Sequence, residues 1–520
     1  MCPPLRSLVP LLLLAACRRE GASSGDDTGT VADGIPTTTE VEELPGTVDF
    51  GCDPAAVTVD GLEGDTLTMT FACAGDAVVA QWSLVSGPTG ATVDGAAGTV
   101  TWATDLASAG ASQVVVAAEG EGVEYASGWF RVTDALGEPG NVGVDPATYT
   151  TEFGLPVFHL AVPEGTNMSK MWPTTAYYRG RRFDVEIQYR GATSSHYPKR
   201  SFRVDFPPDQ EFEDEDEAFP KRRSICLTTT FDDNAYFRQL VVYDLWNAMM
   251  PTRQQIESFF AVLYLDGAYM GLYMLTDRIN GEWWEDYGHF EDGNLYKSVD
   301  HSANFFPTFA GEEKTSLHSG WEKKSGLDEE DFSDLDAFML FVYEADDKTF
   351  DRAIGGQVLV EEWFDWWALA YYTAAFDTVG KNAYLYNDPA SPGWRHAPWD
   401  FNHSLGQRYT TERELASNDW DLTAENGMFT RLRYSEAYGS EMQQRFRDHR
   451  QGVLTPEYIE ALIDGYIERI DDSARRDWSV WRESYRNYDT WSDRTDFTEY
   501  DEEVAYIRQW VHDRHAYLEE

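Results

Sequence analysis

A long apolar and aromatic stretch between residues 361 and 376 ends directly at an acid. It contains no turn residue and is long enough for a buried helix. Asp377 follows it, and Asn382 comes five positions later. Ala383–Tyr386 then has the composition of a strand, and after a turn a second short strand ends at Pro398–Phe401. The pattern predicts a helix, a polar loop that carries Asp377 and Asn382, and a hairpin that ends at Asp400.

Short alternating runs occupy residues 47–133 and are separated by Gly and Asp turns, at the spacing of a β-sandwich. A Gly-, Pro- and Asp-rich linker covers 134–150. Strand-like segments follow, and residues 451–520 have the periodicity of helices, beginning at Thr455-Pro456. The pattern therefore predicts an α+β chain in which a small N-terminal β-sandwich precedes a larger mixed domain.

The N-terminus has the pattern of an export signal. Residues 1–16 carry one cation and a short apolar core, and small residues precede Cys17, which resembles the bacterial lipobox. Residues 17–46 contain almost no large apolar side chain, so we expect a disordered tether. The expected protein is exported and held at the bacterial cell envelope through a lipid on Cys17, at the outer membrane, in the periplasm or on the cell surface. An ordinary secretory signal is the alternative.

The chain is strongly acidic, with 41 Lys and Arg against 90 Asp and Glu in 520 residues and a formal net charge of −49. Such a surface repels nucleic acid and anionic lipid, so we expect no nucleic-acid partner and membrane contact only through the anchor. A saline habitat would also explain the charge. Cys52 and Cys73 are close enough in sequence for a disulfide outside the cytosol, whereas Cys226 lies in an apolar strand and is expected to be buried.

The residues around the predicted hairpin have the chemistry of phosphoryl transfer. Such a site needs a carboxylate to orient the attacking hydroxyl and oxygen ligands for the magnesium ion on the phosphates. Asp377, Asn382 and Asp400 stand at the matching offsets. The Gly-containing loop Arg190–Ser195 lies between two predicted strands, where its backbone and Arg190 could contact phosphates.

Several spaced segments together resemble the CotH kinase family, the atypical kinases similar to spore coat protein H. They occur in the order of that family: Arg190–Ser195, Pro198–Phe206, Gly267–Tyr273, Gly293–Lys297, Asn382–Tyr386 and Pro398–Phe401. Residues 86–90 and 98–102 of the preceding region resemble bacterial immunoglobulin-like modules. The resemblance implies a two-lobed atypical protein-kinase-like domain over 151–450 with a helical C-terminal extension over 451–520.

The resemblance also implies roles and cofactors. ATP with Mg²⁺ or Mn²⁺ would be the donor, and a Ser or Thr of an unknown protein the acceptor. Asp377 would orient the hydroxyl and Asn382 and Asp400 would hold the metal. The expected nucleotide contacts are Arg190, Gly191, Ser194, Lys199 and Asp277.

A lysine on the strand after the loop is expected near the phosphates, with Lys199 as the candidate and Arg200 as the fallback. Asp244 lies on the inward face of a predicted helix, where an unpaired charge is costly, so we expect it to pair with one of these two cations. A rim acid bound to a surface arginine is the alternative.

Two positions depart from the family pattern. Asp277 stands where the family usually has Glu, and Asn402 replaces a second Asp after Asp400. The loss of a charge at Asn402 favours an alternative in which the chain is an inactive kinase-fold scaffold or adhesion lipoprotein. A hydrolase that uses Asp377 and Asp400 as acid and base is a third, weaker hypothesis.

Overall fold

The structure is a computed structural model, and it describes residues 57–62, 65–73, 78–104, 110–133, 145–163, 167–388 and 391–519. The expected leader, the tether, Cys17 and Cys52 lie outside these residues. Cys73 is disulfide-bonded, but its pairing with Cys52 stays a prediction. Within the described ranges, no helix combines the length and the apolar character that crossing a bilayer requires.

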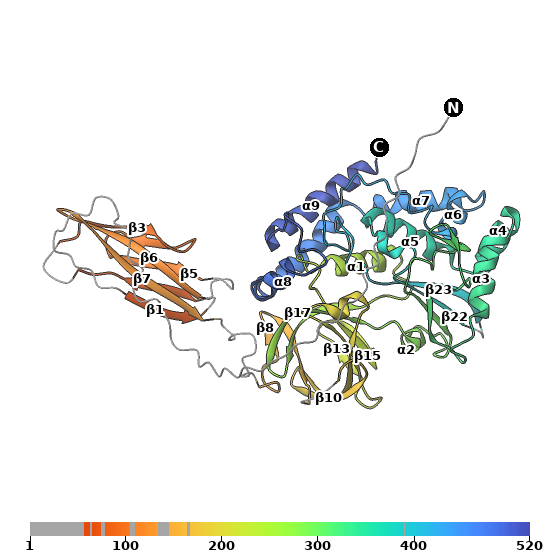
Figure 1. The fold of residues 1–520 in the computed structure, drawn as a ribbon, viewed down its shortest axis with the longest axis horizontal. Helices are drawn as coiled ribbons and strands as arrows, with labels where there is room; N and C mark the ends of the chain where they lie inside the picture. The colour runs from red at the N-terminus through yellow and green to blue at the C-terminus, as the bar shows by residue number, and fades with distance from the viewer. Residues whose placement is uncertain are drawn as a thin grey trace, which may run out of the picture.

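The N-terminal strands form two sheets around one apolar core (Figure 1). The core contains Met69, Trp82, Val100, Val116 and Phe130. The four-stranded sheet has the order β1 (Val57–Leu62), β7 (Val123–Thr133), β6 (Gly110–Glu119), β3 (Gln81–Ser86). The three-stranded sheet has the order β2 (Thr66–Thr70), β5 (Thr99–Ala103), β4 (Thr92–Asp94). The immunoglobulin-like character of this region stays a prediction.

The next strands close into a seven-stranded barrel. It closes because β10 pairs with both β11 and β9, and β9 in turn pairs in parallel with β16. Around the barrel the strands are β9 (Leu155–Ala161), β10 (Trp172–Tyr178), β11 (Arg181–Arg190), β12 (Ser201–Asp205), β15 (Ser224–Thr229), β17 (Ala268–Asp277) and β16 (Ser258–Leu265). The short β8 (Thr151–Glu152) pairs with β9. The sequence predicted strands here, but not their closure.

The apolar run of β16 divides between two cores. Phe259, Ala261 and Leu263 point into the barrel, whereas the alternate residues Phe260 and Val262 join the larger core outside it. Successive side chains of a strand point to opposite faces, so a strand buried on both faces has no polar alternation. At β16 the outer face of the barrel therefore packs against the larger core, whereas on β11 the outward residues Arg182, Asp184 and Glu186 are exposed.

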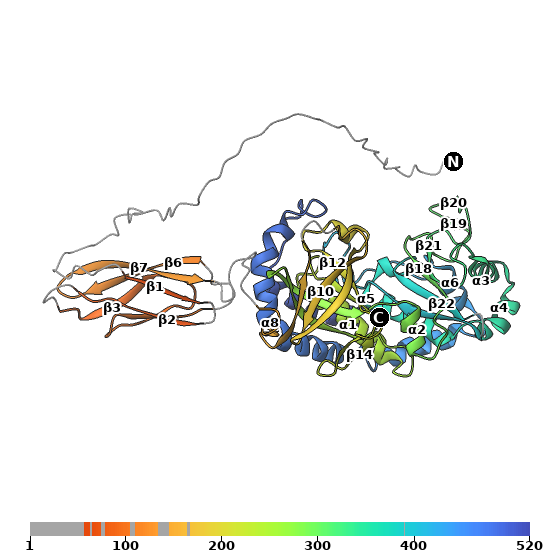
Figure 2. The same cartoon turned by 90° about the horizontal axis from the view of Figure 1, so that it is seen from below.

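A four-stranded antiparallel sheet lies beside the barrel (Figures 1 and 2). Its order is β21 (Trp321–Ser325), β18 (Asn294–Ser298), β22 (Ala383–Asp388), β23 (Ser391–Pro398). The predicted helix before Asp377 is confirmed as α5 (Val360–Thr373), and the predicted hairpin as β22 and β23. Smaller hairpins are β13 (Phe212–Asp214) with β14 (Phe219–Arg222) and β19 (Thr308–Phe309) with β20 (Glu312–Glu313).

The C-terminal helices belong to the main core, not to a separate extension. Thr455 caps α8 (Pro456–Arg486), which packs against β17 and α1, and α9 (Tyr500–Tyr517) packs against α8. Ile459, Ile470 and Ile507 lie in the same core as α5. The expected boundary at residue 450 therefore does not separate two cores. The remaining helices are α1 (Arg238–Met249), α2 (Gly281–Asp286), α3 (Ser333–Glu344), α4 (Asp347–Ala353), α6 (Gly427–Tyr434) and α7 (Gly439–Arg450).

Candidate active site between the barrel and the sheet

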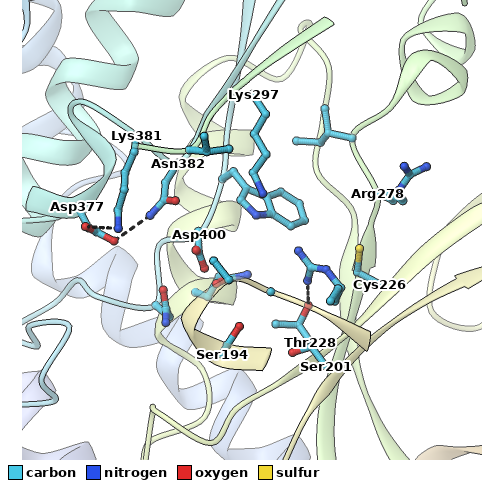
Figure 3. A pocket seen from close by; sticks show the side chains of 18 of the residues that line it. Ser194, Ser201, Cys226, Thr228, Arg278, Lys297, Asp377, Lys381, Asn382 and Asp400 are labelled. Atoms are coloured by element: carbon cyan, nitrogen blue, oxygen red, sulfur yellow. Dashed lines mark hydrogen bonds and ion pairs between the residues drawn. The ribbon is translucent and has the colours of Figure 1, made fainter. Parts of the chain in front are cut away.

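A cavity of about 500 Å³ lies between the barrel and the four-stranded sheet. The barrel contributes residues from β11, β12 and β15, and the sheet contributes residues from β18, β21 and β22. In Figure 3, Asp377, Lys381 and Asn382 gather at one end, and Cys226, Thr228 and Arg278 lie at the other. Cys226, expected to be buried, is 2% exposed and its thiol is free.

The end of α5 delivers Asp377 to the cavity. The helix stops where Ala374 adopts a left-handed conformation, and Asp377 follows in the short turn Phe376–Thr378. Its carboxylate accepts from His301 (Nε2–Oδ1, 3.1 Å) and from Asn382 (Nδ2–Oδ2, 3.0 Å), and it pairs with Lys381 (Nζ–Oδ1, 3.0 Å). Burial alone would raise the pKa of Asp377, but these contacts and His403 hold it well below its usual range. Asp377 is therefore ionised at every working pH.

Asn382 and Asp400 both have left-handed backbones, with φ of 57° and 62°. A left-handed backbone is strained for residues other than glycine, and it persists only where surrounding contacts enforce it. Such residues are often found at functional sites. Here the Trp399 backbone N–H donates to the Asn382 carbonyl at 3.1 Å and ties the two loops together. Both side chains line the cavity.

The Asp400 carboxyl has no hydrogen-bond donor or ion-pair partner among the described residues. Burial raises its pKa although His403 and Lys297 oppose the shift. A half-buried carboxylate without a direct partner carries a desolvation cost, so a bound cation would stabilise it. Asn382 donates to Asp377 through Nδ2, which leaves its Oδ1 for a cation.

These donors fit a magnesium ion that is shared with a nucleotide. The described residues hold no group of three or more His, Cys, Asp or Glu that could bind a metal by itself. Mg²⁺ commonly uses one or two carboxylates, waters and the phosphates of a substrate instead of a protein cage. Asp400 and Asn382 Oδ1 are sufficient for this arrangement.

The loop residues Arg190, Gly191 and Ser194 line the cavity, as the sequence predicted. Arg190 donates to Thr228 (Nη1–Oγ1, 2.8 Å). Gly191 has a φ of 106°, and a Cβ there would lie 2.0 Å from the Ser194 Oγ, so only glycine allows this close turn. The loop therefore brings an arginine and a hydroxyl to the same cavity as Asp400.

Two expected nucleotide contacts are wrong. Lys199 is fully buried outside the lining, where its Nζ pairs with Asp477 of α8 at 2.5 Å and donates to the Leu272 carbonyl at 2.7 Å. Asp277 is also fully buried, and its carboxylate pairs with Arg222 (Nε–Oδ1, 2.6 Å) and accepts from Trp283 (Nε1–Oδ2, 3.0 Å). Both charges are already satisfied by protein partners, so neither side chain faces a ligand.

The expected pairing of Asp244 is wrong as well. Its carboxylate accepts from the Tyr466 hydroxyl at 2.6 Å, and it contacts neither candidate cation. Arg200, the fallback cation, lies over the Tyr189 ring at 4.7 Å. Asp477, some 230 positions after Asp244 in the sequence, supplies the carboxylate that Lys199 requires.

The structure adds four site residues that the sequence reasoning missed: Lys297, Lys381, His301 and His403. Lys297 is the polar end of the matched segment Gly293–Lys297, and its neighbours Leu295 and Tyr296 are buried. Its position directly after these two buried residues in the matched segment was the signal that could have identified it. His403 contacts Asp232 (Nε2–Oδ2, 3.4 Å) and Asp377 (Nδ1–Oδ2, 3.8 Å). The three others also contact Asp377 or line the cavity.

The lining is cationic although the chain is acidic. Four acids line the cavity, namely Asp232, Glu322, Asp377 and Asp400, against six arginines and lysines, namely Arg190, Arg203, Arg278, Lys297, Lys324 and Lys381. Within the described part of the chain, Arg190, Arg278 and Lys297 form no ion pair with an acid. Cations that have no acidic partner can bind a ligand with several negative charges, such as a triphosphate.

Comparisons with known proteins agree with the motif order. A family model described as CotH kinase protein matches residues 187–518. The inner spore coat protein H of Bacillus subtilis (strain 168) is 24% identical over 351 residues, which covers 67% of this chain and 90% of that protein.

Two solved structures were also matched. The Helicobacter pylori proinflammatory kinase CtkA is 9% identical, with 69% of this chain and 91% of that chain covered and a TM-score of 0.23. An endo-fucoidan hydrolase of glycoside hydrolase family 107 is 14% identical, with 33% of this chain and 29% of that chain covered and a TM-score of 0.16. At these TM-scores neither match shows a shared fold.

Proposed function

The chain belongs to the CotH kinase protein family, and from this premise we propose that it transfers the γ-phosphoryl group of ATP to a Ser or Thr hydroxyl. One observation carries the proposal. Asp377, Asn382 and Asp400, which are separated along the sequence, line a single cavity together with cations that have no acidic partner.

In the proposed reaction Asp377 accepts a hydrogen bond from the acceptor hydroxyl and aims its oxygen at the γ-phosphorus. The new P–O bond forms as the bond to the bridging oxygen of ADP breaks, and the hydroxyl proton passes to Asp377 or to the transferred group. Because its pKa is so low, Asp377 acts mainly by orienting the hydroxyl and holds the proton only briefly.

Arg190 and Lys297 would hold the phosphates of the donor, in place of Lys199. A divalent ion held by Asp400 and Asn382 Oδ1 would neutralise phosphate oxygens when bound. Lys381, which pairs with Asp377, would contact the phosphoryl group during its transfer. The cavity would then have a metal end, formed by Asp400 and Asn382, and a cationic wall, formed by Arg190 and Lys297.

The wider setting is proposed from the sequence. The signal at residues 1–16 and a lipid on Cys17 would place the domain at the cell envelope, with the N-terminal sheets as a spacer or adhesion module. The acceptors would then be exported or surface proteins. Because ATP is scarce outside the cytosol, phosphorylation would occur before export or would use another donor.

A second candidate function is a nucleotide-binding scaffold without turnover. Asn402 favours it, because the family pattern has an acid at this position. The Asn402 Nδ2 donates to the Asp232 Oδ2 at 2.6 Å. As a scaffold, the protein would bind a nucleotide and a divalent ion in the cavity but would transfer no phosphoryl group.

The proposal is tested by incubating the purified protein with γ-labelled ATP and Mg²⁺ or Mn²⁺. We expect label uptake into the protein or an added acceptor, and its loss in Asp377→Asn and Asp400→Asn. Asp209→Asn, an exposed acid on a turn, is the matched control and should transfer label normally. Nucleotide binding without label uptake in the wild type would favour the scaffold, and uptake that survives both site variants would overturn the assignment.

A further inference from the structure

Two cations of the cavity rest against aromatic rings and not against acids. The guanidinium carbon of Arg190 lies 5.0 Å from the centre of the Trp399 ring, and the Lys297 Nζ lies 5.9 Å from the same centre. Lys297 is also 5.6 Å from the centre of the Tyr384 ring. Trp399 therefore contacts both of the cations that the proposed function assigns to phosphates.

The positive charges of Arg190 and Lys297 repel each other. Burial lowers the pKa of Lys297, and the neighbouring Arg190 lowers it further. An acid between them would relieve the repulsion, but it would also neutralise the charges and compete with a phosphate. An aromatic ring attracts a cation through its electron-rich face without carrying a net charge. Trp399 can therefore hold both side chains and leave their charges available.

The Trp399 ring is itself firmly held. It is 3% exposed and meets Tyr384 edge to face, with ring centres 5.7 Å apart and planes at 88°. Its backbone N–H donates to Asn382, and the next residue is Asp400. A shift of the ring would therefore disturb both the cationic wall and the proposed metal ligands.

We propose that Trp399 is a positioning residue that holds Arg190 and Lys297 toward the phosphates of a nucleoside triphosphate. The inference rests on the proposed function and deepens it, since it identifies what keeps the phosphate-binding cations in place. Trp399 acts through these cations and transfers no proton.

The first test measures binding by calorimetry with the full mature chain. The probes are the magnesium complex of a non-hydrolysable ATP analogue and inorganic tripolyphosphate. Trp399→Leu should weaken both by about tenfold or more, and Trp399→Phe, which keeps a weaker ring, should fall between Leu and the wild type. Trp129→Leu, a half-exposed tryptophan of β7, is the matched control and should bind like the wild type.

The second test keeps the shape of the side chain. Mono-, di- and trifluorotryptophan introduced at position 399 alone progressively weaken the ring's attraction for cations and leave its size nearly unchanged. The logarithm of the dissociation constant for the ATP analogue should rise steadily with fluorine number. A flat series would overturn the inference, even if Trp399→Leu failed to fold.

Binding by the wild type distinguishes failure of the nucleotide site from failure of the role of Trp399. If the wild type binds neither probe, the proposed nucleotide site is wrong. If the wild type binds both and the fluorinated series is flat, the site stands and the role of Trp399 is wrong.

Discussion

Lys199 and Asp477 form a fully buried ion pair that joins the barrel to helix α8, with the Lys199 Nζ 2.5 Å from the Asp477 Oδ2. The same carboxylate oxygen also accepts from the Leu272 backbone N–H at 2.7 Å. The lysine that the family pattern suggests for the nucleotide therefore connects two parts of the fold.

Removing one partner of this pair should be strongly destabilising. Lys199→Met leaves the Asp477 charge buried without a cation, so we expect the free energy of unfolding to fall by about 3 kcal/mol or more. Lys199→Met combined with Asp477→Leu should recover much of that loss because no charge remains buried. Denaturant unfolding of the two single variants and the double variant measures the coupling. Lys221→Met, at an exposed lysine, is the control and should change stability little.

Lys297 should show the opposite behaviour. It lines the cavity without an acidic partner, so Lys297→Ala should weaken ATP binding by about tenfold to a hundredfold and change stability little. The double variant of Lys199 and Asp477 should bind ATP within about threefold of the wild type. Normal binding by Lys297→Ala, together with lost binding in the double variant, would return the phosphate role to Lys199.

Lys199 and Lys297 show how much of the site could be predicted from the sequence. The apolar and polar pattern predicted the α5 helix, the hairpin and the acids of the cavity, because these residues lie within one segment of about 40 positions. Lys199 and Asp277 were misplaced because their partners are remote in sequence: Asp477 lies on α8 and Arg222 on β14. Local pattern also gave no means to predict that β10 and β9 would pair and close the barrel.

The charge on His403 should give the protein a distinctive pH dependence. Burial alone would lower its pKa, but Asp232 and Asp377 outweigh burial and raise it to about 10. The protonated imidazole therefore stabilises the fold fully below about pH 6.5, and this contribution is lost as the pH rises through about 10. The difference in unfolding free energy between the wild type and His403→Gln should shrink by about 4 to 5 kcal/mol over that interval. A difference that is independent of pH would show that His403 is neutral in the folded protein.

Asp244 should destabilise the folded protein at neutral pH. Burial raises its pKa to about 6, although the Tyr466 hydroxyl opposes the shift. Because the folded protein binds this proton more tightly than the unfolded chain, stability is lost as the pH rises through about 6. Asp244→Asn should therefore be more stable than the wild type at pH 8, by on the order of 2 kcal/mol, and gain little at pH 4. Unchanged ATP binding in this variant would agree with the position of Asp244 outside the cavity lining, whereas weakened binding would restore the expected link to the nucleotide.

The most direct test of the account is a crystal structure of the protein with a non-hydrolysable ATP analogue and Mn²⁺, whose anomalous scattering locates the ion. The account predicts a manganese peak at bonding distance from the Asp400 carboxylate and Asn382 Oδ1, with the phosphates against Arg190 and Lys297 and the γ-phosphate facing Asp377. An analogue bound elsewhere, or a manganese peak in contact with neither Asp400 nor Asn382, would contradict it.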